Sequence, residues 1–600
     1  MTFTRLSALI KRHALCSFLL TFCSYYFLLD AGAKGTIDNF KNFDASQVSK
    51  VEVKIDPLSW ERLCRQNRPI GQSFGKDLKN GYSFKPFSYF KADITINGNH
   101  FRDVGIRKKG FIGSLDGERP SLKVKLNHVH KDQTLNGVTH LTLNNCKQDA
   151  PIVNQFLAYT LFNKAGSPAP RAAFSNVVIN GQNLGIYCHV ESYKKPMVEN
   201  AFGSDKGVLY EGTITDFYPE FEKSFDRKFG SKKTGLKAIR KLISIIHSED
   251  TDETFLNNLK EVLDVDAFLK YWAIESLIGF WDGYSGNKNN FFFYLDPKDD
   301  KFRFMPWGAD SVFTTRQGFG RRGSGPRIQF AKTNGIIAGK LYQIPEIRER
   351  YSVTMKKILE ESWDSNWMLE ETNRLEEMLQ PYVHEAQGGF IEALENLREF
   401  ITYRKENLLK EEADGLPDIP TRYSPPLIAT TIGKMEGQIL LPIFDKHPGE
   451  TDGLGNGKIE VSLHEENPDS VGQNFLAHKV DPEISQRGFG RGWFGRGGFG
   501  RGRGNPEDML QIVLEVFYGD YPDQLTLDFS VNKKDLFIPD ETPIIIQGTA
   551  QIGNEFSNEM ESHSLSGVIK VSAVEEMDGK KNVKFSLDAH VLKRPEFGRF

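Results

Sequence analysis

The chain has 600 residues, of which 39% are hydrophobic and 26% are charged, and its formal net charge is −3. This length exceeds that of one ordinary domain, so two or more domains with substantial cores are expected. The slightly acidic balance argues against a general nucleic-acid-binding protein, because such proteins carry an excess of positive charge.

The first 33 residues have the pattern of a secretory signal peptide. Three basic residues precede an apolar stretch from Ala14 to Leu29, and small residues at 31–33 follow at a spacing suited to cleavage. The stretch is shorter than the ~20 residues of a spanning helix, so cleavage is favoured over an uncleaved anchor, with no membrane span afterwards. The mature protein is therefore expected to be secreted, and to be extracellular, periplasmic or at the cell surface.

Residues 34–49 are expected to form a polar leader, after which short strands alternate with turn signals. The strands are predicted at 50–55, 89–98, 103–110, 121–127, 173–181 and 184–193. One amphipathic helix is predicted among them at 150–166, because Val153, Leu157 and Leu161 recur on one face.

Helices dominate the pattern from about residue 196 to 415. They are predicted at 234–248, 251–280, 345–362, 367–386 and 390–412. Thr251 is a plausible capping residue for the second of these helices, which is apolar nearly all round towards its end and is therefore expected to be buried.

A Pro-rich stretch at 414–426 marks a boundary, and residues 416–600 are predicted to form a separate β-rich domain. Runs of apolar and β-branched residues separated by turn signals are typical of an antiparallel sandwich. Residues 487–504, "RGFGRGWFGRGGFGRGRG", interrupt this pattern as a Gly/Arg/Phe-rich insert. We interpret it as a flexible cationic loop rather than as a specific RNA-binding segment.

The stretch "FWDGYSGNKNNFFFYLDPKDDKFRFMPWGAD", residues 280–310, carries the clearest chemical signal. Asp282 is followed by Asn287 and Asn290, then by two apolar runs joined by a charged turn, and Asp310 ends the second run. Phosphoryl transfer needs a residue that orients the attacking hydroxyl, oxygen ligands for Mg²⁺ and cations for the phosphates. The stretch could supply the first two, but it contains no H-R-D or D-F-G motif, so a regular protein kinase is not indicated.

The predicted strand at 121–127 could supply the cations. Leu122 and Val124 share one face, so Lys123 and Lys125 share the other. Residues 110–120 form a glycine-containing loop that could lie over phosphates. On the local pattern alone, a solvated strand face is favoured over a phosphate site.

The ordered set "DVGIRKKG", "SLKVKLN", "LTLNN" with a following Asp, "AGSPAPRAAF", "VVINGQNLGIYCHVES" and the stretch at 280–310 resembles the spore coat protein H (CotH) kinase-like family over about residues 51–412. The resemblance implies an α+β chain with a two-lobed protein-kinase-like domain at 50–415, its β-rich N-lobe at about 50–195 and its helical C-lobe at about 196–415. ATP would bind between the lobes. A β-sandwich-like domain would follow.

The family resemblance also implies an activity. It is that of a secreted atypical protein kinase, which transfers the γ-phosphate of ATP, with Mg²⁺ or Mn²⁺, to Ser or Thr of surface or coat proteins. Asp282 would be the catalytic aspartate. The metal-binding residues would be Asp310, Asn290 and Asn287, with Asn290 preferred over Asn287.

The same resemblance implies four nucleotide-binding residues. They are Lys123, Lys125, Arg107 and Glu191, the last at the hinge near adenine. The chain departs from the family pattern at Gly308, which replaces the first acid of "PWDxD", and at Gln155, where an acid is sought to pair with the lysine.

Two alternatives to an active kinase remain open. One is a catalytically weak or inactive kinase-like surface or adhesion protein whose C-terminal β domain mediates binding. The other is a glycoside hydrolase that uses Asp282 and Asp310 as its two carboxyl groups.

Overall fold

The computed structural model describes residues 40–68, 86–111, 113–315, 329–416, 418–421, 423–425, 430–444, 456–463, 473–477, 480–485, 509–518, 523–554, 561–577 and 580–593. The expected signal peptide at 1–33, the first residues of the expected leader and the insert at 487–504 lie outside these residues.

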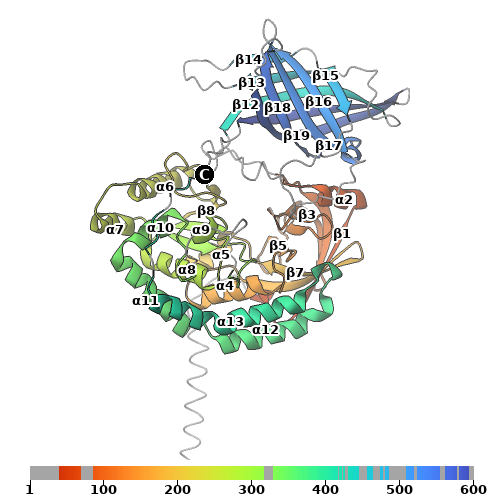
Figure 1. The fold of residues 1–600 in the computed structure, drawn as a ribbon. Coiled ribbons are helices and arrows are strands. Elements are labelled where there is room, and N and C mark those ends of the chain that lie inside the picture. Colours follow the sequence, from red (N-terminus) through yellow and green to blue (C-terminus); the bar gives the residue numbers. More distant parts are fainter. Residues whose placement is uncertain are drawn as a thin grey trace, which may run out of the picture.

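Seven strands of the N-terminal region close into a barrel (Figure 1). They are β1 (Val48–Ile55), β2 (Phe90–Ile96), β3 (Asn99–Lys109), β4 (Ser121–Lys125), β5 (His140–Asn144), β6 (Ala172–Ile179) and β7 (Gln182–Val190). Their order is β1-β2-β3-β4-β5-β7-β6, and the barrel closes because β1 pairs antiparallel with β2 and parallel with β6.

Alternate residues of each barrel strand point inward, as the strand period of two requires. Val51, Ile106, Leu122 and Val124 belong to the barrel core. The short helix α2 (Pro57–Arg65), with Asp56 as its N-cap, adds Leu63 to that core. Lys123 and Lys125 face the other way from Leu122 and Val124, as the sequence pattern predicted.

The middle of the chain combines helices with a second sheet of order β11-β10-β8-β9. Its strands are β8 (Val208–Gly212), β9 (Asp226–Phe229), β10 (Phe291–Asp296) and β11 (Lys301–Pro306). The helices of this region are α4 (Asn154–Lys164), α5 (Lys195–Phe202), α6 (Lys232–Ile246), α7 (Asp252–Lys260), α8 (Val265–Leu277), α9 (Tyr284–Asn287), α10 (Ile336–Gln343), α11 (Pro345–Glu361), α12 (Ser365–Leu379) and α13 (Phe390–Ala413). Short 3₁₀ turns lie at Phe40–Phe43, Gln380–Tyr382 and Glu385–Gln387.

The helix expected at 251–280 is two helices, α7 and α8. The chain breaks between them because Leu263 forms a parallel bridge with Phe302 of β11. Asp264 then caps α8 by accepting a hydrogen bond from the Ala267 backbone N–H at 3.0 Å. Thr251 caps α7, as predicted.

The expected two-lobed protein-kinase-like architecture is wrong, although the chain is α+β overall. The strands expected to form an N-lobe close into a barrel, and the region expected to be a helical C-lobe contains its own four-stranded sheet. One hydrophobic core also runs from barrel residues Phe174, Ile186 and Cys188 through α8 to Leu408 of α13. The barrel is therefore packed into the helical region and does not form a separate lobe.

The C-terminal region forms one antiparallel sheet of order β14-β13-β12-β20-β19-β18-β17-β16-β15. Its strands are β12 (Thr430–Phe444), β13 (Asn456–Leu463), β14 (Gln473–Ala477), β15 (Val480–Ser485), β16 (Met509–Tyr518), β17 (Asp523–Asn532), β18 (Ile544–Asn554), β19 (Glu561–Met577) and β20 (Lys580–Lys593), with the short helix α14 (Lys533–Leu536) after β17.

The expected sandwich in this region is also wrong. The described strands pair in one continuous order, so they form a single sheet and not two separate ones. The sheet encloses its own core, which includes Phe529, Ile546, Leu565 and Phe585. It lies above the barrel and the helices in Figure 1.

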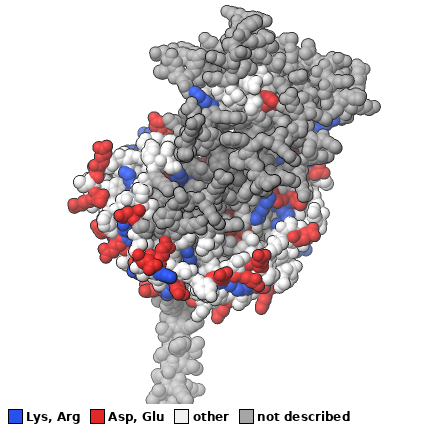
Figure 2. All heavy atoms as spheres, viewed as in Figure 1, with Lys and Arg blue, Asp and Glu red and all other residues white. Residues whose placement is uncertain are grey.

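Acidic and basic side chains are interspersed over the described surface drawn in Figure 2, with no large area of one sign on that face. Within the described ranges, no helix is long and apolar enough to cross a membrane. Cys64, Cys146 and Cys188 are free thiols, and the last two are buried.

Candidate functional site

The loop that carries Asp282 is built on a buried carboxylate, Glu275 of α8. Its oxygens accept hydrogen bonds from the backbone N–H groups of Tyr284 and Ser285, both at 2.8 Å, and from the Tyr271 hydroxyl at 2.6 Å. Burial raises the pKa of Glu275. The two backbone bonds fix the start of α9 directly after Asp282, so the loop has a defined shape.

Three asparagine amides surround the Asp282 carboxylate, and we call them the amide cage. Asn287 donates to it at 2.6 Å, Asn290 at 2.8 Å, and Asn289 to both oxygens at 3.2 Å. Burial raises the pKa of Asp282, and the three amides oppose this by stabilising the charged form. The cage therefore orients the carboxylate and partly offsets the effect of burial on its pKa.

Asp310 lies close to Asp282, at the end of the hairpin formed by β10 and β11. The Trp307 N–H donates to the Asn290 backbone oxygen at 2.9 Å and ties the two segments together. Burial and the charge of Asp282 raise the pKa of Asp310 to about 7, although the ammonium of Lys109 opposes both. The structure thus brings the two predicted acids together.

Gly308, the departure from the family's usual acid, has a structural explanation in this chain. Its φ is +54°, in the left-handed region that favours glycine. A Cβ at this position would lie 2.8 Å from Asn290 Oδ1. The Asn290 amide therefore occupies the space that a side chain at 308 would need.

Four cations project from the outer face of the barrel strands β3 and β4, and we call them the cation row. They are Arg107, Lys109, Lys123 and Lys125. Arg107 and Lys123 are direct neighbours across the two strands. No hydrogen bond or ion pair joins the Lys123 or Lys125 ammonium groups to a side chain in the described part of the chain.

The cation row concentrates positive charge. Burial, together with the charges of Lys194, Arg107, Lys109 and Lys228, lowers the pKa of Lys123 to about 7. Burial and the neighbouring lysines also lower the pKa of His140 to about 3. Unpaired cations in such a group are stabilised by a bound anion, because it relieves their mutual repulsion.

Lys109 links the cation row to the acids, and sequence reasoning missed it. Burial lowers its pKa to about 8, while Asp310 opposes the shift. Its ammonium donates to Asn144 Oδ1 and lies 5.8 Å from the centre of the Trp307 ring. The signal was present: Lys109 follows Arg107 at a spacing of two, so both share the outer face of β3.

Gln155 faces Lys109 through an intermediate amide. Asn144 Nδ2 donates to Gln155 Oε1 at 2.7 Å, while Asn144 Oδ1 accepts from Lys109. Gln155 stands where an acid was sought to pair with a lysine. It is connected through the Asn144 amide to Lys109, and not to Lys123. An amide relay orients an ammonium without cancelling its charge.

Asp149 is a third carboxylate in this part of the molecule. It accepts hydrogen bonds from the backbone N–H groups of Asn154 and Gln155, at 3.2 and 3.3 Å, and so fixes the start of α4. Burial raises its pKa well above the usual value, and the charge of Asp310 raises it further. Asn154 in turn donates to the Asp310 backbone oxygen at 2.9 Å.

Glu191, unlike the other predicted site residues, is paired with an arginine, Arg171. Its carboxylate accepts hydrogen bonds from Arg171 Nη2 at 2.6 Å and Arg171 Nε at 3.0 Å. This bidentate pair engages both carboxylate oxygens. The predicted contact with adenine stays a prediction.

The donors near Asp310 fit a hard divalent cation. Among the described residues no group of three or more His, Cys, Asp and Glu is arranged to hold a metal ion. Mg²⁺ commonly takes one or two carboxylates and completes its shell with water and substrate phosphates. Asp310 offers one such carboxylate, and Asp282 lies near enough for its charge to raise the pKa of Asp310, an effect that a bound cation would oppose.

The fold and site together define an α+β protein in which the cation row on the barrel lies near two carboxylates, Asp282 in the loop before α9 and Asp310 after the hairpin of β10 and β11. A family model described as "CotH kinase protein" matches residues 94–408, just over half of the chain. The chain belongs to the CotH family, as its sequence motifs predicted.

Proteins of Bacillus subtilis and Rhizopus delemar are similar to parts of this chain. Inner spore coat protein H of Bacillus subtilis (strain 168) is 23% identical over 302 residues, covering 48% of this chain and 77% of that protein. Invasin CotH2 of Rhizopus delemar is 24% identical over 200 residues, 30% of this chain and 33% of the invasin. An inner spore coat protein H-like protein of Bacillus subtilis is 24% identical over 241 residues, 39% of this chain and 65% of that protein.

Proposed function

We propose that this chain transfers the γ-phosphate of ATP to Ser or Thr side chains of surface or coat proteins. The observation that carries the proposal is that two carboxylates, Asp282 and Asp310, lie near each other and near Lys109. Lys109 belongs to the cation row, which also holds cations without a carboxylate partner among the described residues. A metal–nucleotide complex suits such a site, because its metal ion is attracted to the carboxylates and its phosphates to the cations.

Each group of residues has a distinct role in the proposed reaction. The Asp282 carboxylate orients the acceptor hydroxyl and takes up its proton, and the amide cage holds that carboxylate in place. Lys109, Lys123 and Arg107 bind the phosphate oxygens by charge-assisted hydrogen bonds. Asn144 and Gln155 position the Lys109 ammonium.

Asp310, with Asn290 or Asn287, would hold Mg²⁺ or Mn²⁺, which when bound screens the negative charge of the phosphates. Asp310 is suited to this role because burial and the nearby charge of Asp282 both raise its pKa, and a bound cation would oppose both effects. We place the proposed acceptors outside the cell or in a coat, because the relatives are named as spore coat proteins and invasins.

The direct test is incorporation of label from γ-phosphate-labelled ATP with Mg²⁺ by the full chain, using serine-rich peptides and the chain itself as acceptors. We expect incorporation that requires the divalent cation and stops when it is chelated. Absence of incorporation under conditions where the nucleotide binds would favour the alternative of an inactive surface or adhesion protein.

A further inference from the structure

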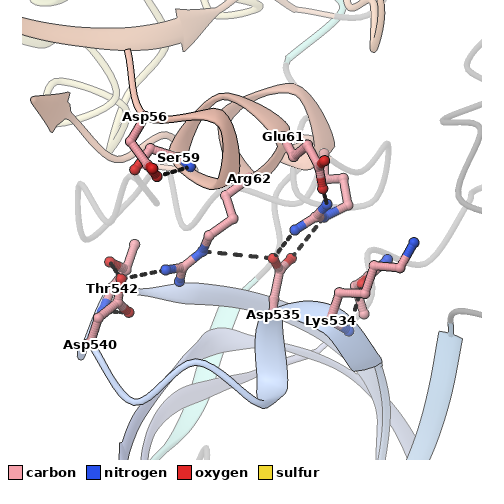
Figure 3. Close-up of polar contacts among 10 residues, drawn as sticks. Asp56, Ser59, Glu61, Arg62, Lys534, Asp535, Asp540 and Thr542 are labelled. Atoms are coloured by element: carbon pink, nitrogen blue, oxygen red, sulfur yellow. Dashed lines mark hydrogen bonds and ion pairs between the residues drawn. The ribbon is translucent and has the colours of Figure 1, made fainter. Parts of the chain in front are cut away.

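The C-terminal sheet contacts the barrel through charged side chains (Figure 3). Arg65 of α2 donates from Nη2 to Asp535 Oδ1 at 2.5 Å and from Nε to Asp535 Oδ2 at 3.4 Å. Arg62 of α2 donates from Nη1 to Asp540, and its Nε lies 3.7 Å from Asp535 Oδ1. Asp535 belongs to α14, which Leu536 anchors in the core of the sheet.

This contact is built from buried, paired charge. The Arg62 side chain is 5% exposed and the Asp535 side chain is 13% exposed. In the described part of the chain, the only carboxylates that pair with Arg62 are those of Asp535 and Asp540. Burying a guanidinium is unfavourable unless a carboxylate compensates it, so the pairing specifies how the sheet docks.

A second contact ties the chain that leads into the sheet to the loop of the candidate site. The Lys288 ammonium donates to the Ser424 backbone oxygen at 2.9 Å and to the Ser424 hydroxyl at 3.2 Å. The Ser424 N–H donates to the Tyr218 hydroxyl at 3.0 Å. Lys288 lies between Asn287 and Asn289, two members of the amide cage, so this connection reaches the surroundings of Asp282.

The first contact likewise reaches the cation row. The backbone oxygen of Cys64, in α2, accepts a hydrogen bond from the Lys108 ammonium at 2.7 Å. Lys108 directly precedes Lys109 on β3. The two attachments therefore end next to Lys109 on one side of the site and next to Asp282 on the other.

We propose that the C-terminal sheet acts as a strap. By docking on α2 through Arg62 and Arg65, it holds the cation-bearing strand and the Asp282 loop in their mutual positions. When these ion pairs break, the sheet stays tethered by the segment before β12 but no longer restrains either side. The proposal concerns coupling between the sheet and the site and does not depend on phosphate transfer.

The test uses charge reversal with a swap. Two double variants should undock the sheet: Arg62→Glu with Arg65→Glu, and Asp535→Arg with Asp540→Arg. The quadruple variant, which combines all four changes, should restore the ion pairs with their charges exchanged, so the sheet should dock again. The readout is backbone hydrogen exchange in the full chain without ligand. In each double variant we expect exchange to accelerate about tenfold, equivalent to about 1.4 kcal/mol, in both α2 and residues 284–290. The quadruple variant should restore both rates.

A control matched in charge to the arginine double variant is Lys54→Glu with Lys237→Glu, which alters two exposed lysines elsewhere. It should leave both rates at wild-type values. If hydrogen exchange accelerated only in α2 and not in residues 284–290, the strap would be overturned. Breaking the ion pairs would then affect only the contact itself. Unchanged rates in the double variants, or a quadruple variant that stays as fast as they are, would overturn it as well.

Discussion

Replacing Asp310 by Asn is expected to lower the rate of phosphate transfer by about 10³-fold without destabilising the protein. The substitution keeps the size of the side chain and removes the charge that the proposed metal ion needs. It also removes a charge that is unfavourable because of burial and of repulsion from Asp282, the two effects that raise the pKa of Asp310. The initial rate of label transfer at saturating Mg²⁺, together with thermal unfolding, measures both effects.

The stability effect has a defined pH window. The folded-state pKa of Asp310 is about 7 against a usual value of 3.8, so between these values the folded protein binds more protons than the unfolded chain. Wild-type stability should therefore fall as pH rises from about 4 to about 7, and the loss should be complete above that. Asp310→Asn should show a smaller fall.

The control for Asp310→Asn is Asp266→Asn, which alters a carboxylate whose side chain is 83% exposed. It should retain the wild-type rate. If Asp310→Asn kept the wild-type rate, Asp310 would not hold the metal ion. If it unfolded at a clearly lower temperature, burial of the charge and its repulsion from Asp282 would not be the dominant effects on stability at this position.

Replacing Lys109 by Met is expected to raise the dissociation constant for ATP about 10- to 100-fold and to lower the transfer rate by about 10²-fold. The substitution removes the ammonium that faces Asp310 and is oriented by Asn144. Because Lys109 lowers the pKa of Asp310, its loss should also move the acidic limb of the pH–rate profile to higher pH.

Lys54→Met serves as the control for Lys109→Met, since Lys54 is an exposed lysine on the barrel strand β1. Neither affinity nor the pH profile should change in it. An unchanged pH profile in Lys109→Met would contradict the electrostatic link between Lys109 and Asp310, even if ATP bound more weakly.

The sequence predicted much of the local structure and the order of the site residues. Alternation along 121–127 correctly placed Lys123 and Lys125 opposite Leu122 and Val124, because strand geometry fixes a period of two. The closure of the barrel could not be predicted in this way. It depends on β1 pairing with both β2 and β6, and no local pattern records a partner more than a hundred residues away.

The same limit explains which site residues were missed. Asp282 and Asp310 stand out because polar residues flank apolar strands within one short stretch. Lys109, Glu275 and Asp149 act through contacts across the fold. The pattern around Lys109 also suits an ordinary strand face and that around Asp149 a helix cap, whereas Glu275 lies in a helix whose pattern indicates only that it is apolar and buried. Gln155 was noticed, but its connection to Lys109 through Asn144 requires the pairing of β5 with β4.

A calorimetric titration of the full chain with ATP and Mg²⁺ at pH 8, in two buffers of different ionisation enthalpy, tests most directly whether the cation row and the two acids form one nucleotide site. At this pH Asp310 is largely ionised, whereas Lys123 and Lys109, with pKa values of about 7 and 8, are largely or half neutral. Bound phosphates should raise both lysine pKa values. We therefore predict binding with net proton uptake, which Lys123→Met reduces and Lys54→Met does not. Binding without proton uptake, or no binding at millimolar ATP, would contradict a nucleotide site on the cation row.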